Sequence, residues 1–155
     1  MTDLQRLKWT KNVKRDDGAW AYCQFKVSDL FKLAWKDDEI NASKPEKDDL
    51  VLLRQQGYVT HLVRVLDYKA EHEDWKGDYN IYRIVEVLWT IDFGIPPQSA
   101  RANVMFDYLE VLRYEGGNVM KLEDLTTFKK RWDNHRGLGG FQTHIQSLLA
   151  LPSSS

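Results

Sequence analysis

The most regular pattern along the chain is an alternation of side chains over residues 79–91. Successive side chains of a strand point to opposite faces, so one face of this stretch is expected to carry Ile81, Arg83, Val85, Val87 and Trp89. The opposite face is expected to carry Tyr82, Ile84, Glu86, Leu88 and Thr90. Both faces are largely apolar, which predicts a long strand covered on both sides, as in a closed or strongly curved sheet.

Two shorter apolar runs upstream of this strand predict a β-hairpin. Residues 49–54 form the first run and residues 58–66 form the second, and both runs are rich in Leu and Val. The Gln56-Gly57 pair between them is a typical turn sequence.

The N-terminal part of the chain is less regular. Residues 1–18 are polar and mildly basic, which predicts an arm or a short edge element that leads into the fold. The aromatic stretch 20–27 predicts a strand, because aromatic and β-branched residues favour extended structure. Ser28 and Asp29 then favour the N-cap of a short helix that ends at Trp35.

The C-terminal part contains one ambiguous segment and one clear helix. Residues 103–115 fit strand and helix patterns equally well, and we expect a strand because the turn sequence Gly116-Gly117 follows. Residues 122–132 carry apolar side chains at helical spacing and predict a helix. Residues 137–140 predict a hinge or tight loop, and residues 141–149 predict a last short element.

Together these elements predict one domain that is mostly β, with a few short helices. We place this domain at residues 19–151, after the N-terminal arm of residues 1–18 and before a disordered tail of residues 152–155. A chain of 155 residues, of which 43% are hydrophobic, is long enough to bury a sizeable core.

Charge and cysteine content narrow the class of protein. The formal net charge is −1, so the chain is not a polycation that binds nucleic acid by bulk charge, although a local basic face is compatible with this balance. No apolar run reaches the roughly 18 to 20 residues that span a bilayer. The start of the chain lacks a secretory pattern, and the single cysteine cannot form an internal disulfide. We therefore expect a cytoplasmic protein with no membrane partner.

The common catalytic motifs are absent from the sequence. It contains no GxSxG, Walker, GxGxxG or HExxH pattern, and Gly137-Leu-Gly-Gly140 lacks the Lys-Ser/Thr pair of a phosphate-binding loop. His72-Glu73-Asp74 are adjacent in a charged loop, where neighbouring side chains diverge rather than converge on a metal. We therefore predict no catalytic activity, no cofactor and no metal site. The alternative is a small hydrolase that uses a loop carboxylate with His61 or His144.

Aromatic residues are abundant, with six Trp, seven Tyr and six Phe. Trp89 and Tyr82 lie on the predicted long strand, where core packing is the simplest interpretation. Trp20, Trp35 and Trp75 are candidates either for packing under loops or for a surface on which a planar ligand stacks.

Basic residues gather at two places in the sequence, near the end of the predicted 122–132 helix and near the N-terminus. Such runs are either solvated ends of elements or, where they share one face, contacts for phosphate groups. The candidate phosphate-binding residues are Lys129, Lys130, Arg131, Arg136, Lys11 and Lys14.

Two short segments flank the predicted strands in a characteristic order. Pro45-Glu-Lys-Asp48 precedes the first strand of the hairpin, and Met120-Lys-Leu-Glu-Asp-Leu125 leads into the predicted helix. This order resembles the PUA-like superfamily, closest to its EVE and YTH branches, over roughly residues 20–145. Those branches have a PGD turn at the first place, where this chain lacks the glycine, and a V/L-x-L-E-E-L segment at the second. The GxKxxExR signature of the ASCH branch, which includes hydrolases, is absent.

The resemblance implies an α+β fold, a small curved β-barrel flanked by short helices. It also implies a pocket that holds a flipped or unpaired base between aromatic side chains. The candidate base-binding residues are Trp35, Trp89 and Trp20 for the walls, Tyr22, Ser28 and Asp29 for the base edge, and Asp92 as an acceptor near the mouth.

The function implied by the resemblance is recognition of a methylated or hydroxymethylated base in nucleic acid, with DNA preferred over RNA. Bacterial members of this kind serve as specificity modules of modification-dependent restriction systems, so a nuclease or another effector is an expected partner. The residues alone leave one alternative open, a protein-interaction domain that docks a partner through a Trp-rich surface.

Overall fold

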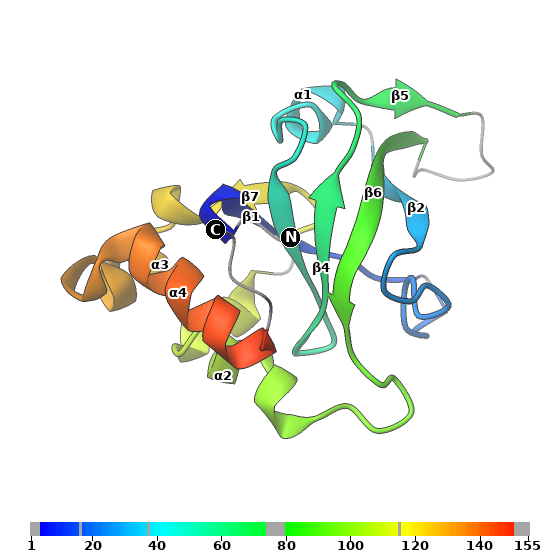
Figure 1. The fold of residues 1–155 in the computed structure, drawn as a ribbon. Helices are drawn as coiled ribbons and strands as arrows, with labels where there is room; N and C mark the ends of the chain where they lie inside the picture. Colours follow the sequence, from blue (N-terminus) through cyan, green and yellow to red (C-terminus); the bar gives the residue numbers. More distant parts are fainter. Residues whose placement is uncertain (1–3, 16, 37, 74–79, 115, 151–155) are drawn as a thin grey trace.

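A mixed β-sheet forms the centre of the computed structural model, which describes residues 4–15, 17–36, 38–73, 80–114 and 116–150 (Figure 1). The sheet is seven-stranded, with six strands in the order β2-β6-β4-β3-β1-β7 and β5 paired with β6. The β1–β3 pair is parallel and the other pairs are antiparallel. The strands are β1 (Leu7–Asn12), β2 (Leu30–Trp35), β3 (Leu50–Gln55), β4 (Tyr58–Val65), β5 (Glu71–His72), β6 (Ile81–Thr90) and β7 (Val119–Lys121).

Short helices connect the strands, and the longer ones follow the last strand. The α-helices are α1 (Glu39–Ala42), α2 (Ala102–Met105), α3 (Thr126–Trp132) and α4 (Gly137–Leu149). Single 3₁₀ turns occur at Leu4–Arg6, Gln98–Ala100, Leu109–Arg113, Leu122–Asp124 and Asp133–His135. Helices α2, α3 and α4 lie together on one side of the sheet (Figure 1).

The sheet curls strongly into a half-barrel, and a separate hydrophobic cluster covers each of its faces. We call the cluster on the face that the helices cover the outer cluster, and the one on the opposite face the inner cluster. On β3, Leu50 and Leu52 belong to the outer cluster, whereas Val51 and Leu53 belong to the inner cluster. The helices pack on the outer face through Ala102, Met105, Phe128, Trp132, Phe141, Ile145 and Leu149. All six strands of the main path contribute to the inner cluster, which therefore fills the inside of the curl; its strand residues include Trp9, Leu33, Val51, Val63, Val85 and Val119.

The elements with the clearest sequence patterns are confirmed. The hairpin forms as β3 and β4, with the turn at Gln56-Gly57. The long strand forms as β6, and its buried positions alternate from Ile81 to Val87. The α+β class with a curved sheet and short helices is likewise confirmed, whereas the PUA-like assignment stays a prediction.

The N-terminal arm expected over residues 1–18 is wrong for residues 7–12, because these form β1 inside the sheet, between β3 and β7. A register shift between Leu7 and Trp9 places Leu7 in the outer cluster and Trp9 in the inner cluster. The polar residues of the segment gain partners in the sheet, since the Thr10 hydroxyl donates to the carbonyl oxygen of Leu52 (2.9 Å). The polar composition of residues 7–12 therefore led to the wrong prediction of an arm for a strand that lies inside the sheet.

The strand and helix expected over residues 20–35 are also wrong. Residues 21–24 and 27–28 are turns, whereas the predicted helix is the strand β2. Phe31, Leu33 and Trp35 are buried with exposed or half-buried residues between them, which is a period of two. Asp29 accepts a hydrogen bond from the backbone N–H of Lys26 (2.8 Å) and so closes a turn instead of capping a helix.

Two C-terminal expectations need correction, and one is confirmed. The strand expected over residues 103–115 is replaced by α2 and the 3₁₀ turn Leu109–Arg113. The hinge expected at residues 137–140 is the first turn of α4, whose buried residues recur every four positions. The helix expected over residues 122–132 forms as a 3₁₀ turn followed by α3. The predicted tail of residues 152–155 lies outside the described residues.

The start of α4 generates a stability prediction, because its glycines differ in the space around them. A Cβ at Gly140 would overlap the backbone carbonyl of His135, whereas one at Gly139 would meet no atom within 4 Å. We expect Gly140→Ala to lower the free energy of unfolding by about 2 kcal/mol through overpacking. Gly139→Ala, the matched control, should leave it unchanged or raise it by up to about 1 kcal/mol. Urea denaturation checks both values, and equal effects would contradict the close approach.

Candidate functional site

A cavity of about 670 Å³ opens where β1 ends, and we call it the β1-end pocket. The segments that line it come from four parts of the chain. They are Lys11–Arg15, Ala21 with Tyr22 and Gln24, Ala34 with Lys36, and Gly116–Asn118. Its volume lies within the range of pockets that bind small organic ligands.

The lining of the β1-end pocket is basic. Lys11, Lys14, Arg15 and Lys36 are among its described lining residues, and none of the described lining residues is acidic. Arg15 has a carboxylate partner outside the lining, Asp17 (2.7 Å). The whole chain has a formal net charge of −1, so this positive charge is local. Such a pocket attracts anions and electron-rich groups. Of the residues predicted from the sequence, it brings together Lys11, Lys14 and Tyr22.

Lys11 is the most unusual residue of the β1-end pocket, because its side chain is 2% exposed. The amine donates to the carbonyl oxygen of Gly117 and lies 4.8 Å from the centre of the Trp35 ring. Burial, with a smaller contribution from the positive charge of Arg54, lowers the pKa of Lys11 to about 7. The amine therefore changes charge near neutral pH.

Trp35 stands behind Lys11 and does not line the cavity. It is 1% exposed, and its indole N–H donates to the side-chain oxygen of Asn41 (2.8 Å). Asn41 also accepts from the backbone N–H of Val119 (2.7 Å) and donates to the carbonyl oxygen of Val119 (3.0 Å). The ring expected to stack on a base is thus held in place with the Lys11 amine above it.

Tyr22 forms one wall of the β1-end pocket and is firmly held. Its ring stacks on Phe31 with a centroid distance of 4.4 Å, and its hydroxyl accepts from the backbone N–H of Ala34 (3.1 Å). Its backbone has a positive φ of 58°, a conformation that a residue with a side chain adopts at an energetic cost. Neighbouring contacts hold it there, and one of them comes from His61.

His61 fixes the backbone of Tyr22 through a buried hydrogen-bond chain. Its Nε2 lies 3.1 Å from the carbonyl oxygen of Tyr22, and its Nδ1 lies 2.8 Å from the Thr60 hydroxyl. The carbonyl oxygen of Tyr22 can only accept, so Nε2 carries the proton and the neutral ring accepts at Nδ1 from the Thr60 hydroxyl, which itself accepts from the Gln55 amide (3.0 Å). His61 is thus neutral with its proton on Nε2. Burial lowers its pKa to about 4, while the bond to Tyr22 acts in the opposite direction.

The other candidate base-binding residues lie outside the lining of the β1-end pocket. Trp20 packs against Phe93 (5.4 Å between centroids), and Trp89 packs on the outer cluster. Asp92 accepts from the backbone N–H of Gly94 (2.9 Å). Ser28, at a positive φ of 78°, and Asp29 make a turn.

The Trp-rich surface expected for protein docking is small among the described residues. Trp9, Trp35 and Trp132 are buried, and Trp20 and Trp89 are half-buried. Trp75 lies outside the described residues.

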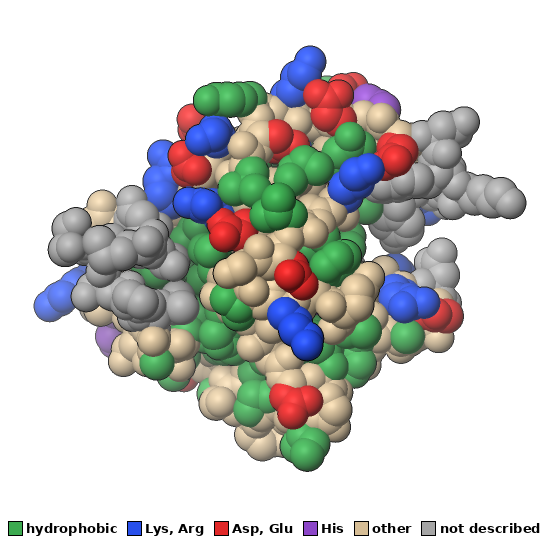
Figure 2. Space-filling model, turned by 45° about the vertical axis from the view of Figure 1, so that its right-hand side comes forward, with side chains coloured by type: hydrophobic (Ala, Val, Ile, Leu, Met, Phe, Trp, Pro, Cys, Tyr) green, Lys and Arg blue, Asp and Glu red, His purple; other side chains and the backbone are tan. Residues whose placement is uncertain are grey.

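The basic residues near α3 do not line the β1-end pocket. Lys129, Lys130 and Arg136 are exposed. Arg131 forms an ion pair with Asp107, and its guanidinium lies 4.4 Å from the centre of the Trp132 ring. The β1-end pocket therefore contains residues of only one of the two predicted basic clusters, and the face in Figure 2 shows basic and acidic side chains interspersed.

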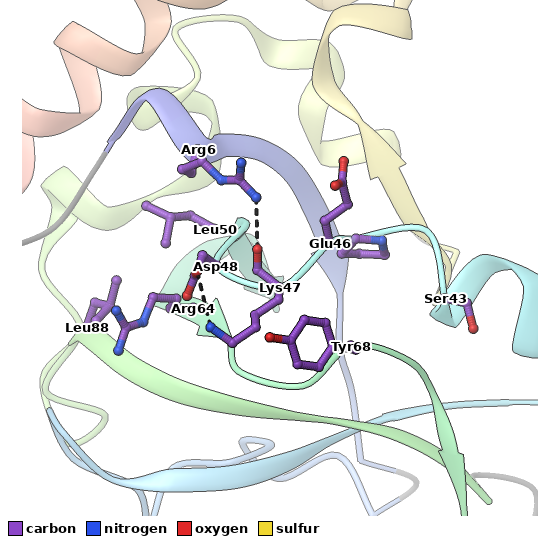
Figure 3. A pocket seen from close by; sticks show the side chains of 10 residues that line it. Arg6, Ser43, Glu46, Lys47, Asp48, Leu50, Arg64, Tyr68 and Leu88 are labelled. Atoms are coloured by element: carbon purple, nitrogen blue, oxygen red, sulfur yellow. Dashed lines mark hydrogen bonds and ion pairs between the residues drawn. The ribbon is translucent and has the colours of Figure 1, made fainter.

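A second cavity of about 710 Å³ is charge-balanced and hence less suited to an anion (Figure 3). Its lining includes Arg6, Lys47 and Arg64, and each of these cations has a carboxylate partner. The ion pairs are Arg6–Asp49 (2.8 Å), Lys47–Asp48 (3.4 Å) and Arg64–Glu86 (2.6 Å). Arg6 also donates to the carbonyl oxygen of Lys47 (2.8 Å).

Each histidine of the hydrolase alternative makes contacts within the fold. Besides the His61 contacts described above, Nε2 of His144 lies 2.9 Å from the carbonyl oxygen of Met105. No group of three His, Cys, Asp or Glu side chains suited to a metal occurs among the described residues. Within the same residues, no helix combines the length and the apolar character needed to cross a bilayer.

Comparison with protein-family models, with curated proteins and with solved structures gave no match. The PUA-like resemblance therefore rests on the sequence pattern, and the site is interpreted from its own geometry.

Sequence reasoning missed several lining residues, namely Asn12, Gln24, Lys36 and Gly116–Asn118. One signal pointed to the region. Trp9, Lys11 and Val13 occupy alternate positions, and a lysine between two buried apolar residues is unusual on the inner face of a sheet.

The His61 contacts generate a pH prediction. The unfolded chain binds a proton at this residue near pH 6.5 and the folded chain only near pH 4, so stability falls as pH falls through this interval. We expect His61 to contribute a loss of about 3 kcal/mol between pH 7.5 and pH 4. His61→Asn should be less stable at pH 7.5 and lose less on acidification, as measured by urea denaturation. His135→Asn, at an exposed position, is the control, and parallel pH profiles of wild type and His61→Asn would contradict the assignment.

Proposed function

We propose that this chain is a non-catalytic module that binds nucleic acid and takes one base into the β1-end pocket. The observation that supports this proposal is a locally basic cavity in a chain whose net charge is −1. A phosphate-bearing polymer meets such a site through its backbone charge, and the cavity gives a base somewhere to bind.

The polar groups of the β1-end pocket suit the binding of a base and its neighbouring phosphates. Lys14 and Arg15 lie on the exposed segment after β1, where they are placed to contact phosphate groups. The side-chain amides of Asn12, Gln24 and Asn118 can both donate and accept, as recognition of a base edge requires, and the Asn118 amide also donates to Asp38 (3.1 Å). Tyr22 adds the aromatic wall on which a base packs.

We infer the kind of base and the kind of polymer from the resemblance to EVE and YTH domains. A methylated or hydroxymethylated base is the proposed ligand, with DNA preferred over RNA. A nuclease or another effector is the proposed partner, as for a specificity module of a modification-dependent restriction system. The extra methyl group adds apolar contact and is expected to contribute about 1–3 kcal/mol of discrimination.

A binding titration tests the proposal directly. The purified protein is titrated against single- and double-stranded DNA and RNA that carry plain or methylated cytosine or adenine. We expect binding to at least one modified strand to be five-fold or more tighter than to its plain counterpart. Absence of binding to every oligonucleotide at low salt would overturn the proposal.

A salt series on two variants tests where the phosphate contacts lie. Lys14→Gln should weaken binding several-fold and reduce the slope of log K against log salt by roughly 0.7 for a single strand, since one phosphate contact is lost. Lys130→Gln on α3 makes the same charge change at an exposed position outside the pocket lining and should leave the slope unchanged. Equal effects of the two variants would place the interface elsewhere.

A further inference from the structure

We propose that Lys11 is the specificity-determining residue of the β1-end pocket, and that its ammonium group selects a base that carries an oxo group over adenine. This inference rests on the function proposed above and names the class of base that the pocket holds. The modified base is then one such as 5-methylcytosine or 5-hydroxymethylcytosine, and N6-methyladenine is disfavoured.

The first step of the argument is the position of the Lys11 amine. Lys11 is one of the residues that line the cavity, yet it is only 2% exposed, so a ligand group that contacts the amine is shielded from water. In such surroundings a hydrogen bond that is not made costs more than at the surface. A contact at this depth therefore discriminates between ligands more strongly than one at the mouth.

The second step is a count of hydrogen-bond donors. A lysine ammonium has three N–H groups and no acceptor. The carbonyl oxygen of Gly117 takes one of them, and the face of the Trp35 ring attracts the cation from a second side. One N–H group is left for the ligand.

The third step is the charge that the amine meets. Among the described residues, Lys14, Arg15 and Lys36 line the same cavity, and Arg54 acts on Lys11 from β3. All four are cations, of which Arg15 is paired with Asp17 (2.7 Å), and the described lining residues include no carboxylate, so an electron-rich group of the ligand stabilises the ammonium form of Lys11. The oxo groups of cytosine, guanine and thymine are strong acceptors. The ring nitrogens of adenine also accept, but its exocyclic amine is a donor and would face the donor of the ammonium.

The central experiment compares two bases that differ at one position. A single-stranded oligoadenosine with one central hypoxanthine is compared with the all-adenine strand, because these bases differ by an oxo group in place of an amine at position 6. The assay is fluorescence anisotropy at pH 6, below the pKa of about 7, where Lys11 is an ammonium. We expect the hypoxanthine strand to bind about tenfold more tightly. Strands with a central 5-methylcytosine should likewise exceed strands with a central N6-methyladenine.

Two variants assign the preference to Lys11. Lys11→Met keeps the length of the side chain and removes the donor, so the preference for hypoxanthine should disappear. Lys14→Met, at the exposed edge of the same pocket, should weaken binding to both strands by the same factor and keep the preference. Thermal unfolding of each variant establishes that it is folded. If Lys11→Met does not fold, Lys11→Leu, which also removes the donor, takes its place in the same comparison.

The outcomes separate this inference from the function on which it rests. Equal affinity of the wild-type protein for the two strands overturns the inference and leaves the proposed function standing. A preference that persists in Lys11→Met also overturns it. If Lys11→Met weakens both strands equally, the ammonium contacts a phosphate and not a base, which again overturns it. Failure of every strand to bind overturns the proposed function itself.

Discussion

The pairing of β1 with β3 and β7 is the interaction on which the rest of the structure depends. It joins the N-terminal segment to the central hairpin on one side and to the segment before the C-terminal helices on the other. The polar side chains of β1 are satisfied there, since Arg54 donates to the Thr10 hydroxyl (2.7 Å), which itself donates to the carbonyl oxygen of Leu52 (2.9 Å). The same pairing places Lys11 beside Gly117 and thereby forms the floor of the β1-end pocket.

The parts of the fold that could be predicted from the sequence are those in which local pattern and final environment agree. The hairpin β3–β4 and the long strand β6 are apolar, regular and bounded by turn residues. β1 was missed because its polar residues are satisfied by partners from distant parts of the chain. In β2, the apolar pairs Leu30-Phe31 and Ala34-Trp35 have a spacing that also fits a helix. The segment is a strand because it pairs with β6. Residues 103–115 were equally ambiguous until the outer face of the sheet supplied a surface for α2.

The candidate site could be predicted only in part, for a related reason. Lys11, Lys14 and Tyr22 were selected for basic charge and aromatic character, and the structure places them in one cavity. Trp35 was selected for the same aromatic character, but the inner cluster and the Asn41 contact hold it behind Lys11. The type of a side chain indicates what it can bind. Whether the side chain is buried depends on the pairing of strands that are distant in the sequence. Gly116–Asn118 illustrate the point, because nothing local distinguishes a turn that lines a pocket from one that faces solvent.

The central position of β1 also has a consequence for the order in which the chain folds. Thr10 contacts Leu52 across a separation of 42 residues, and Lys11 contacts Gly117 across a separation of 106. During synthesis, β1 is therefore made before its partners β3 and β7. The β3–β4 hairpin and β6 can pair with each other over shorter separations. Contacts at such separation carry a large loop-closure entropy and slow the folding reaction. We therefore expect the β1-end pocket to be among the last features of the molecule to form, so that an intact pocket indicates a complete sheet.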